Sequence, residues 1–294
     1  MNNEKKLNVD ISKSISEFRG FIKEFEMKLK LYKKLFRGKG IEFDSFRAYS
    51  SDDDASLIDW KASKRANKLL VKHYREEKNL KIFFAIDMSD NMLLGSGDKL
   101  KCEYSAEIIA ALAYLVLSSK DKAGFLFFSD KVIEYFPPQM DEKQFHRAVD
   151  FLLNPKNYGG SSNFDSVLDF LINYITADGI FLISDFLGLK NSHENKIKLL
   201  PHKFETSCVM VRDILDISLP DVSGEYIIED SSSGEQILIN PRIAKREYEI
   251  FSAEQIKYLR NLFKSSNIDF IELFTTDSFV PKLAEFLKER ARTR

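Results

Sequence analysis

Short apolar runs recur along the chain, and they predict the strands of a sheet. The clearest run, at residues 82–86 (IFFAI), is rich in β-branched and aromatic residues and contains no polar residue. Such a run is typical of a strand that is buried on both faces, as in a parallel sheet. Further runs that predict strands occupy residues 123–128, 179–183, 206–211 and 268–274.

Between these runs, the apolar positions follow helical spacing. Residues 100–117 are apolar on nearly all sides, which predicts a helix buried against the sheet. Amphipathic patterns predict further helices at residues 145–152, 164–175, 244–264 and from about residue 281. Strands that alternate with helices in this way are typical of an α/β fold with a doubly wound, mostly parallel, Rossmann-type sheet.

Residues 1–40 predict an amphipathic N-terminal helix. Its apolar stripe, spaced alternately by four and three positions, consists of Ile11, Ile15, Phe18, Ile22, Phe25, Leu29, Tyr32 and Phe36. Basic residues flank the stripe, so the helix either packs on its own domain or binds a membrane surface or a partner's groove. We favour packing, because apolar stripes normally mark burial.

Residues 41–79 predict a small accessory β region in front of a main domain at residues 80–294. Residues 41–49 alternate weakly between apolar and polar positions, and residues 69–74 predict a second strand. Residues 225–240 contain two short apolar runs around the turn SSSGE, which is typical of a β-hairpin. We expect this hairpin to join the accessory β region.

Composition narrows the classes of function. The 294 residues carry a formal net charge of −1, so there is no overall basic field to recruit nucleic acid. The N-terminal sequence MNNEKKLNVD lacks the apolar core of a secretory signal, and no apolar stretch is long enough to span a bilayer. Cys102 and Cys208 show no metal-binding spacing. We therefore expect a cytoplasmic protein with two reduced thiols.

Oxygen-bearing side chains follow several of the predicted strands. They are Asp87, Ser89 and Asn91 after residues 82–86, Ser162 in the loop GGSSN, and Asp185 after residues 179–183. Ligands of open α/β sheets bind beyond the carboxyl ends of the strands, so we expect these side chains to meet there. Carboxylates, hydroxyls and water suit a hard cation, which predicts a Mg²⁺ (or Mn²⁺) site and argues against zinc.

This pattern resembles a von Willebrand factor A domain with its metal-ion-dependent adhesion site. That site combines a DxSxS motif after the first strand, a threonine in a GGT-type loop and an aspartate after a later strand. Here the first motif reads DMSDN at residues 87–91, Ser162 stands at the threonine position, and Asp185 lies in LISDF. Asn91 and Ser162 depart from the motif, although both still offer an oxygen. The resemblance implies a bound Mg²⁺ that accepts a carboxylate from a partner protein.

The upstream stretch GKGIEFDSFRAYSSDDDASLIDWKASKRANKLLVKHYREE resembles the signature of the domain-of-unknown-function-58 family, which carries a von Willebrand A-like domain. The matching positions are Arg47, Tyr49, Asp53, Asp54, Asp59, Trp60 and Arg65. The resemblance implies a partnership with a MoxR-type AAA+ ATPase, in which the A-like domain is an adaptor or assembly factor for a client protein. It favours a non-enzymatic interaction module. From the residues alone, these aspartates are helix caps or members of a buried ion-pair network with Arg47 or Arg65.

Two other functions stay open. A strand that ends in an aspartate is also typical of haloacid-dehalogenase-like hydrolases, in which Asp87 would be the nucleophile of a metal-dependent phosphoryl transfer. That chemistry requires a second aspartate two residues later, where this chain has Ser89. The other alternative is a metal-free scaffold whose N-terminal helix binds a membrane or a partner. In such a protein, Asp87, Ser89 and Asn91 would only hydrogen-bond a strand-to-helix turn.

Overall fold

The computed structural model describes residues 7–23, 42–50, 53–75, 79–229 and 235–293. Its centre is a six-stranded sheet with the strand order β10-β7-β6-β3-β4-β5. The strands are β3 (Lys81–Asp87), β4 (Lys122–Phe128), β5 (Val132–Gln139), β6 (Gly179–Ser184), β7 (Glu205–Arg212) and β10 (Asp269–Phe274). All neighbours pair in parallel except β4 and β5, which pair antiparallel at one edge. The predicted doubly wound, mostly parallel sheet is thereby confirmed.

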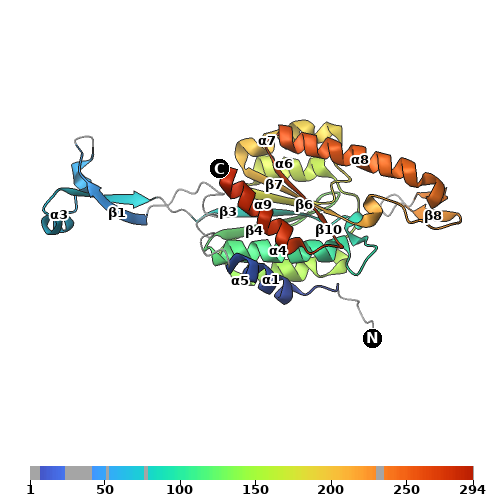
Figure 1. The fold of residues 1–294 in the computed structure, drawn as a ribbon, viewed down its shortest axis with the longest axis horizontal. Helices are drawn as coiled ribbons and strands as arrows, with labels where there is room; N and C mark the ends of the chain where they lie inside the picture. Colours follow the sequence, from blue (N-terminus) through green and yellow to red (C-terminus); the bar gives the residue numbers. More distant parts are fainter. Residues whose placement is uncertain (1–6, 24–41, 51–52, 76–78, 230–234, 294) are drawn as a thin grey trace.

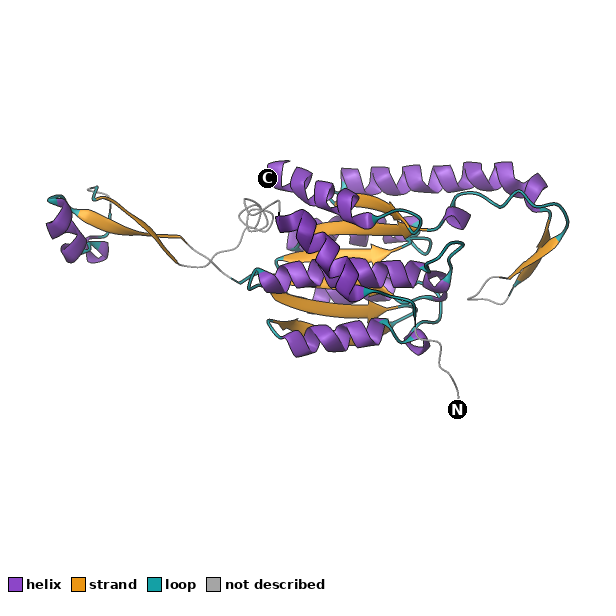
Figure 2. Cartoon of the chain, turned by 60° about the horizontal axis from the view of Figure 1, so that its bottom comes forward, coloured by secondary structure: helices purple, strands orange, loops and turns teal. Residues whose placement is uncertain are grey.

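Helices cover both faces of this sheet (Figure 2). One face packs against α4 (Lys101–Ser118), α5 (Glu142–Leu152) and α9 (Phe279–Thr293). The other packs against α6 (Phe164–Tyr174), α7 (Glu194–Lys203) and α8 (Pro241–Ser265). Successive side chains of a strand point to opposite faces, so Phe84 of β3 enters the first core and Phe83 the second. Because β3 is buried on both faces, its sequence is continuously apolar.

Short 3₁₀ helices connect several of these elements. They are η1 (Ala55–Leu57), η2 (Asp90–Leu93), η3 (Pro155–Asn157), η4 (Asn191–His193) and η5 (Ile214–Asp216). Helix α7 is a feature that the sequence pattern did not predict. Only Ile197 and Leu200 of this helix are buried, and Pro201 lies inside it. Its apolar stripe is therefore too sparse to signal a helix.

The described part of the N-terminal region packs on the domain. Helix α1 (Ile11–Lys23) lies against α4 and α9 (Figure 1), with Phe18 buried between them and the sheet-covering core. The backbone N–H of Asp10 donates to Glu107 of α4 at 3.2 Å. The expected packing is thus observed for residues 11–23. The remaining stripe positions Phe25, Leu29, Tyr32 and Phe36 lie outside the described residues.

Two small antiparallel sheets complete the structure. In the accessory region, β1 (Glu42–Ala48) pairs with β2 (Leu70–Arg75), and α3 (Trp60–Ala66) lies between them in the chain. The second sheet pairs β8 (Tyr226–Glu229) with β9 (Gln236–Ile239). Figure 1 shows the two sheets at opposite ends of the molecule.

The expectation that the 225–240 hairpin joins the accessory region is therefore wrong for the strands that the structure describes. The physical reason is the direction of the parallel strands. Strand β2 precedes the amino end of β3, whereas β8 follows the carboxyl end of β7. The amino and carboxyl ends of parallel strands lie at opposite ends of a sheet, and the two hairpins extend from those opposite ends.

Within the residues described, no helix is both long and apolar enough to cross a membrane.

Candidate functional site

The carboxyl edge of the sheet brings several of the predicted site residues together. Asp87 ends β3 and is fully buried. Its Oδ2 accepts hydrogen bonds from Ser162 Oγ at 2.8 Å and from Ser184 Oγ at 2.6 Å. Its Oδ1 accepts from the backbone N–H of Ser89 at 2.9 Å. Asp185, the residue after Ser184, is also fully buried.

Strand register and loop contacts explain this convergence. Strands β3 and β6 pair with Ile86 opposite Ile183, so the residues that follow them in the chain lie side by side. The loop that carries Ser162 is tied to the loop after β3. Gly159 N–H donates to the Met88 carbonyl at 2.9 Å, and Gly160 N–H donates to Asp90 Oδ2 at 2.8 Å.

Two glycines allow the loops to approach so closely. Gly160 has a φ of 77°, which is a left-handed conformation that favours glycine. Gly188 lies against the backbone and side chain of Ser162, so a Cβ atom at position 188 would collide with Ser162. Glycine therefore occupies position 188, in the loop after β6, where the backbone of this loop contacts the loop that carries Ser162.

A buried lysine lies on the far side of Asp185. Lys101 Nζ donates to Asp185 Oδ2 at 2.8 Å and to Asp216 Oδ1 at 3.2 Å, and the Lys101 side chain is 0% exposed. Burial lowers the pKa of Lys101, but the two carboxylates outweigh it, and the pKa lies above its ordinary value. Sequence reasoning missed Lys101 and Asp216, and also Ser184, which donates to Asp87. The only signal for Lys101 was a lysine at the start of a largely apolar helix.

The cluster contains three carboxyl groups, Asp87, Asp185 and Asp216, and one ammonium group, that of Lys101. Burial raises the pKa of Asp87, and repulsion from Asp185 raises it further, while hydrogen bonds from Ser184 and Ser89 only partly oppose these effects. The Lys101 ammonium is shared between Asp185 and Asp216, and so it does not neutralise Asp87. Uptake of a proton by Asp87, or binding of a second cation beside it, would therefore stabilise the cluster.

The residues around Asp87 fit a hard cation. Ser89 Oγ is buried and finds no hydrogen-bond partner among the residues described. Together with Asp87 and Ser162 it forms an all-oxygen donor set, which is the type that Mg²⁺ prefers. Over the described ranges, no group of three or more His, Cys, Asp or Glu side chains is arranged to hold a metal. A cation here would thus rely on hydroxyl groups and water, as Mg²⁺ commonly does.

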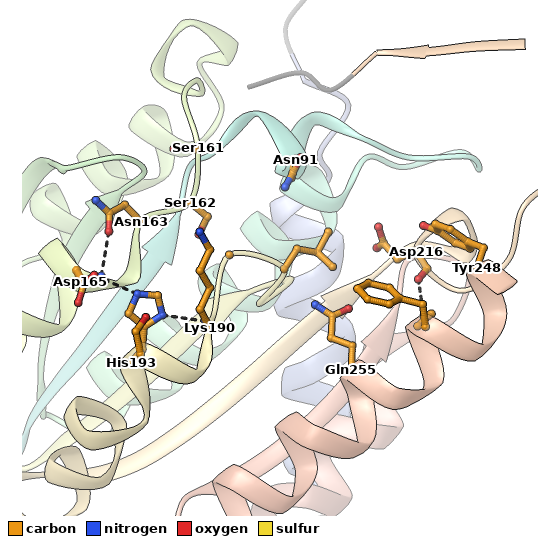
Figure 3. Close-up of a pocket in the computed structure, with 15 residues that line it drawn as sticks. Asn91, Ser161, Ser162, Asn163, Asp165, Lys190, His193, Asp216, Tyr248 and Gln255 are labelled. Carbon is orange, nitrogen blue, oxygen red and sulfur yellow. Dashed lines mark hydrogen bonds and ion pairs between the residues drawn. The ribbon is translucent and has the colours of Figure 1, made fainter. Parts of the chain in front are cut away.

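A pocket of about 840 Å³ opens beyond this cluster (Figure 3). Asn91 and Ser162 line it from the loops that follow β3 and α5, and Tyr248 and Gln255 face it from α8, with Asp216 beside Tyr248. Lys190 extends toward the loop of Ser162. The pocket offers polar groups from several elements, which is the usual anatomy of a binding site.

His193 in this pocket has a hydrogen-bond partner at each ring nitrogen. Its Nδ1 accepts from the backbone N–H of Lys190 at 2.9 Å. Its Nε2 therefore carries the proton and donates to Asp165 Oδ2 at 3.2 Å. This pair fixes the loop that forms one wall of the pocket.

The signature aspartates have a different role, because they lie in the accessory region. Arg47 forms an exposed ion pair with Asp53, which also accepts from the Ser50 N–H at 2.9 Å. Asp54 caps η1 and Asp59 caps α3 through backbone N–H groups. The expected buried ion-pair network is wrong for Arg47, whose side chain is 47% exposed. Trp60 and Arg65 lie on α3 and Tyr49 follows β1, and Figure 1 shows β1 and α3 apart from the central sheet.

Comparison with known proteins supports the resemblance to the domain-of-unknown-function-58 family. A family described as "Protein of unknown function DUF58" matches residues 45–257. The chain belongs to this family. No curated protein matches the sequence.

Several solved structures are similar to this DUF58 protein. The conserved hypothetical protein BatB from Bacteroides thetaiotaomicron is 12% identical, with 72% of this chain and 99% of that chain covered and a TM-score of 0.45. An aerotolerance-related membrane protein from Bacteroides fragilis NCTC 9343 is 14% identical, with 73% and 100% covered and a TM-score of 0.47. The PilB minor pilin from Streptococcus sanguinis is 10% identical, with 77% and 65% covered and a TM-score of 0.38. Likenesses this distant carry no argument about function.

Proposed function

We propose that this DUF58 protein is a non-enzymatic interaction module that binds a segment of a partner protein at the carboxyl edge of its sheet. It acts as an adaptor or assembly factor with a MoxR-type AAA+ ATPase, as the family resemblance implies. The observation that carries the proposal is the meeting of Asp87, Ser89 and Ser162 beneath a polar pocket. A buried acid that has no basic partner among the described residues, below an open pocket, is suited to recognition through a cation.

A Mg²⁺ or Mn²⁺ ion would be held by Asp87, Ser89 and Ser162, with Asn91 and Asp185 around it. When bound, such an ion offers a coordination position to a carboxylate of the partner. The chain's own residues prepare this site. Ser184 orients the Asp87 carboxylate through its 2.6 Å hydrogen bond, and Lys101 holds Asp185 in place from the other side.

The geometry opposes a hydrolase that uses Asp87 as its nucleophile. Such a carboxylate must reach the phosphorus of its substrate, with one oxygen free to attack. Asp87 is 0% exposed and is not among the residues that line the pocket, so its carboxylate does not face a substrate bound there. The side chain at position 89, where that chemistry wants a second aspartate, is a serine.

The proposal is tested by binding of the cognate MoxR-type ATPase to the immobilised full chain in Mg²⁺. Asp87→Asn keeps the shape of the side chain and removes its charge, so it is expected to abolish binding. The matched control is Asp150→Asn, an exposed aspartate on α5, which should bind like the wild type. Equal binding of the wild type and Asp87→Asn, with both proteins folded by circular dichroism, would overturn the proposal.

A further inference from the structure

One positive charge on the wall of the pocket has no counter-charge among the residues that the structure describes. The acidic and basic side chains that line the pocket are Asp165, Lys190, His193 and Asp216. Asp216 is paired with Lys101. Asp165 is paired with Lys196 at 2.9 Å and contacts His193 at 3.2 Å. The ammonium group of Lys190, by contrast, forms no ion pair or hydrogen bond with a described residue.

The backbone of Lys190 is anchored, although its side chain is exposed. Its N–H donates to His193 Nδ1 at 2.9 Å, and its carbonyl accepts from the His193 N–H at 2.9 Å. From this loop the side chain extends toward Ser162 (Figure 3). An ammonium that reaches into a pocket from an anchored loop and has no partner there is available to an anion.

The opposite wall of the pocket offers an exposed aromatic ring. Phe251 of α8 lines the pocket and is 69% exposed. Tyr248 and Gln255 lie three positions before and four positions after it, so the three side chains share one face of the helix. Aromatic side chains are enriched at protein interfaces, and an occupant that covers Phe251 removes apolar surface from water.

We infer that the pocket takes a segment of a partner protein in which an acidic residue lies next to an apolar residue. The carboxylate pairs with Lys190, and the apolar side chain packs on Phe251. This carboxylate is additional to the one that a cation held by Asp87 would accept. The inference rests on the proposed function, because it names the chemistry of the segment that binds at the same site.

The two walls together favour such a segment over other occupants. A free phosphate carries nearly two negative charges, whereas the pocket presents one unpaired ammonium, and it would leave Phe251 in water. A basic segment would place like charges together at Lys190. A neutral apolar segment would cover the ammonium without giving it a partner. A carboxylate beside an apolar side chain satisfies both walls.

Two synthetic peptides, acetyl-Leu-Glu-Leu-amide and acetyl-Leu-Gln-Leu-amide, test this inference, because they share a shape and differ in charge. Each is titrated into the isotope-labelled full chain in a chelator, and NMR follows the backbone amides of residues 186–193. The glutamate peptide should bind the wild type about tenfold more tightly than the glutamine peptide, as one charge-assisted contact requires.

Variants assign the preference to the two walls. Lys190→Ala should remove the difference between the peptides, and Lys190→Arg should keep it, since the positive charge remains. Phe251→Ala should weaken the binding of both peptides alike, by about tenfold. Lys257→Ala removes an exposed lysine of α8 that does not line the pocket, and it should behave like the wild type.

Three results would overturn the inference: equal binding of the two peptides, a preference that persists in Lys190→Ala, or no binding of the glutamate peptide at millimolar concentration. Inorganic phosphate that competes as strongly as the glutamate peptide would overturn it as well. Because the titrations contain a chelator, none of these results depends on a cation at Asp87. Lys190→Ala should still take up Mg²⁺, so failure of this inference is distinguishable from failure of the proposed function.

Discussion

The two aspartate-rich regions of this protein show how burial decides what an acid does. At the sheet edge, Asp87, Asp185 and Asp216 lie in the interior, where Asp185 and Asp216 share the ammonium group of Lys101 and Asp87 has no basic partner among the described residues. Burial raises the pKa of Asp87 and of Asp216. These carboxylates are held in place at a cost in free energy, which is common at functional sites and unusual elsewhere.

In the accessory region, the aspartates serve the local fold. Asp53 pairs with the exposed Arg47, and the hydrogen bond from Arg47 holds the pKa of Asp53 below its ordinary value. Asp54 and Asp59 accept backbone N–H groups at the starts of η1 and α3. The same residue type is thus a cap in one region and a candidate ligand in the other, and only the surroundings distinguish them.

Removing Lys101 from its buried cluster with Asp185 and Asp216 should have the largest effect on the free energy of unfolding. Lys101→Met keeps much of the side-chain volume but leaves Asp185 and Asp216 without their ammonium. We expect it to lower the free energy of unfolding by about 3–5 kcal/mol. Urea denaturation followed by far-ultraviolet circular dichroism measures this. The matched change in the accessory region, Arg47→Met, removes an exposed pair and should have little effect. Equal stability of Lys101→Met and the wild type would contradict the account.

A smaller effect is expected where the loops of the site touch. Gly188→Ala places a Cβ atom against the backbone of Ser162 and must push the loop away from Asp87. We expect a loss of about 1–3 kcal/mol in the free energy of unfolding, together with weaker Mn²⁺ binding. Gly97→Ala is the control, because a Cβ there meets no atom within 4 Å. If the two variants behaved alike, the close approach of the loops would not matter to the site.

In the accessory region, loss of a cap should cost less. Asp59→Ala removes the side chain that accepts the Ala62 N–H at 2.9 Å, and we expect a local loss of about 1 kcal/mol. Trp60 follows Asp59 and is the only tryptophan, so its fluorescence reports on this region alone. Unfolding followed by far-ultraviolet circular dichroism, to which the helices of the main domain contribute most, should hardly change. A change in Mn²⁺ binding by this variant would contradict the separation of the two regions.

The smallest expected effect is on how stability depends on pH in the absence of metal. The stability contributions of Asp87 and Asp53 should change with pH in opposite directions. Because the pKa of Asp87 is raised on folding, the native state binds more protons than the unfolded state. Stability therefore falls as pH rises through the raised pKa, and Asp87→Asn should be the more stable protein at neutral pH. The advantage should vanish in acid, below the unfolded pKa.

Asp53 should show the opposite behaviour. Its pKa is lowered on folding, so its contribution to stability is present above the unfolded pKa and is lost as pH falls through the folded pKa. Asp53→Asn should therefore reduce stability at neutral pH and have no effect in strong acid. Denaturation curves of both variants over a pH series in a chelator test the contrast, and curves of the same sign would refute it.

Much of the sheet and part of the site could be predicted from sequence, because both follow from local patterns. The apolar run before Asp87 marks a buried strand, and the parallel order of strands brings Asp87 and the predicted Asp185 to one edge. The residue of β6 that hydrogen-bonds to Asp87 is Ser184, which the sequence analysis did not single out. The meeting of Ser162 with Asp87 follows from the glycines that let the loop fold over. These residues lie at the ends of elements whose direction the sequence already indicates.

The missed parts depend on long-range packing. A lysine at the start of a helix is ordinarily a solvated residue, so nothing local shows that Lys101 reaches Asp185 and Asp216, which lie far along the chain. The 225–240 segment predicts a hairpin, but not the edge of the molecule at which the hairpin stands. Helix α7 was missed because tertiary contacts of Ile197 and Leu200, rather than a full apolar stripe, hold it in place.

The measurement that tests the central claim most directly is calorimetric titration of Mg²⁺ and Mn²⁺ into the full chain. The account predicts uptake of one ion by the wild type and by Asp150→Asn, and none by Asp87→Asn. Absence of binding to the wild type, or equal binding to Asp87→Asn, would contradict the claim that Asp87 anchors a cation at this edge of the sheet.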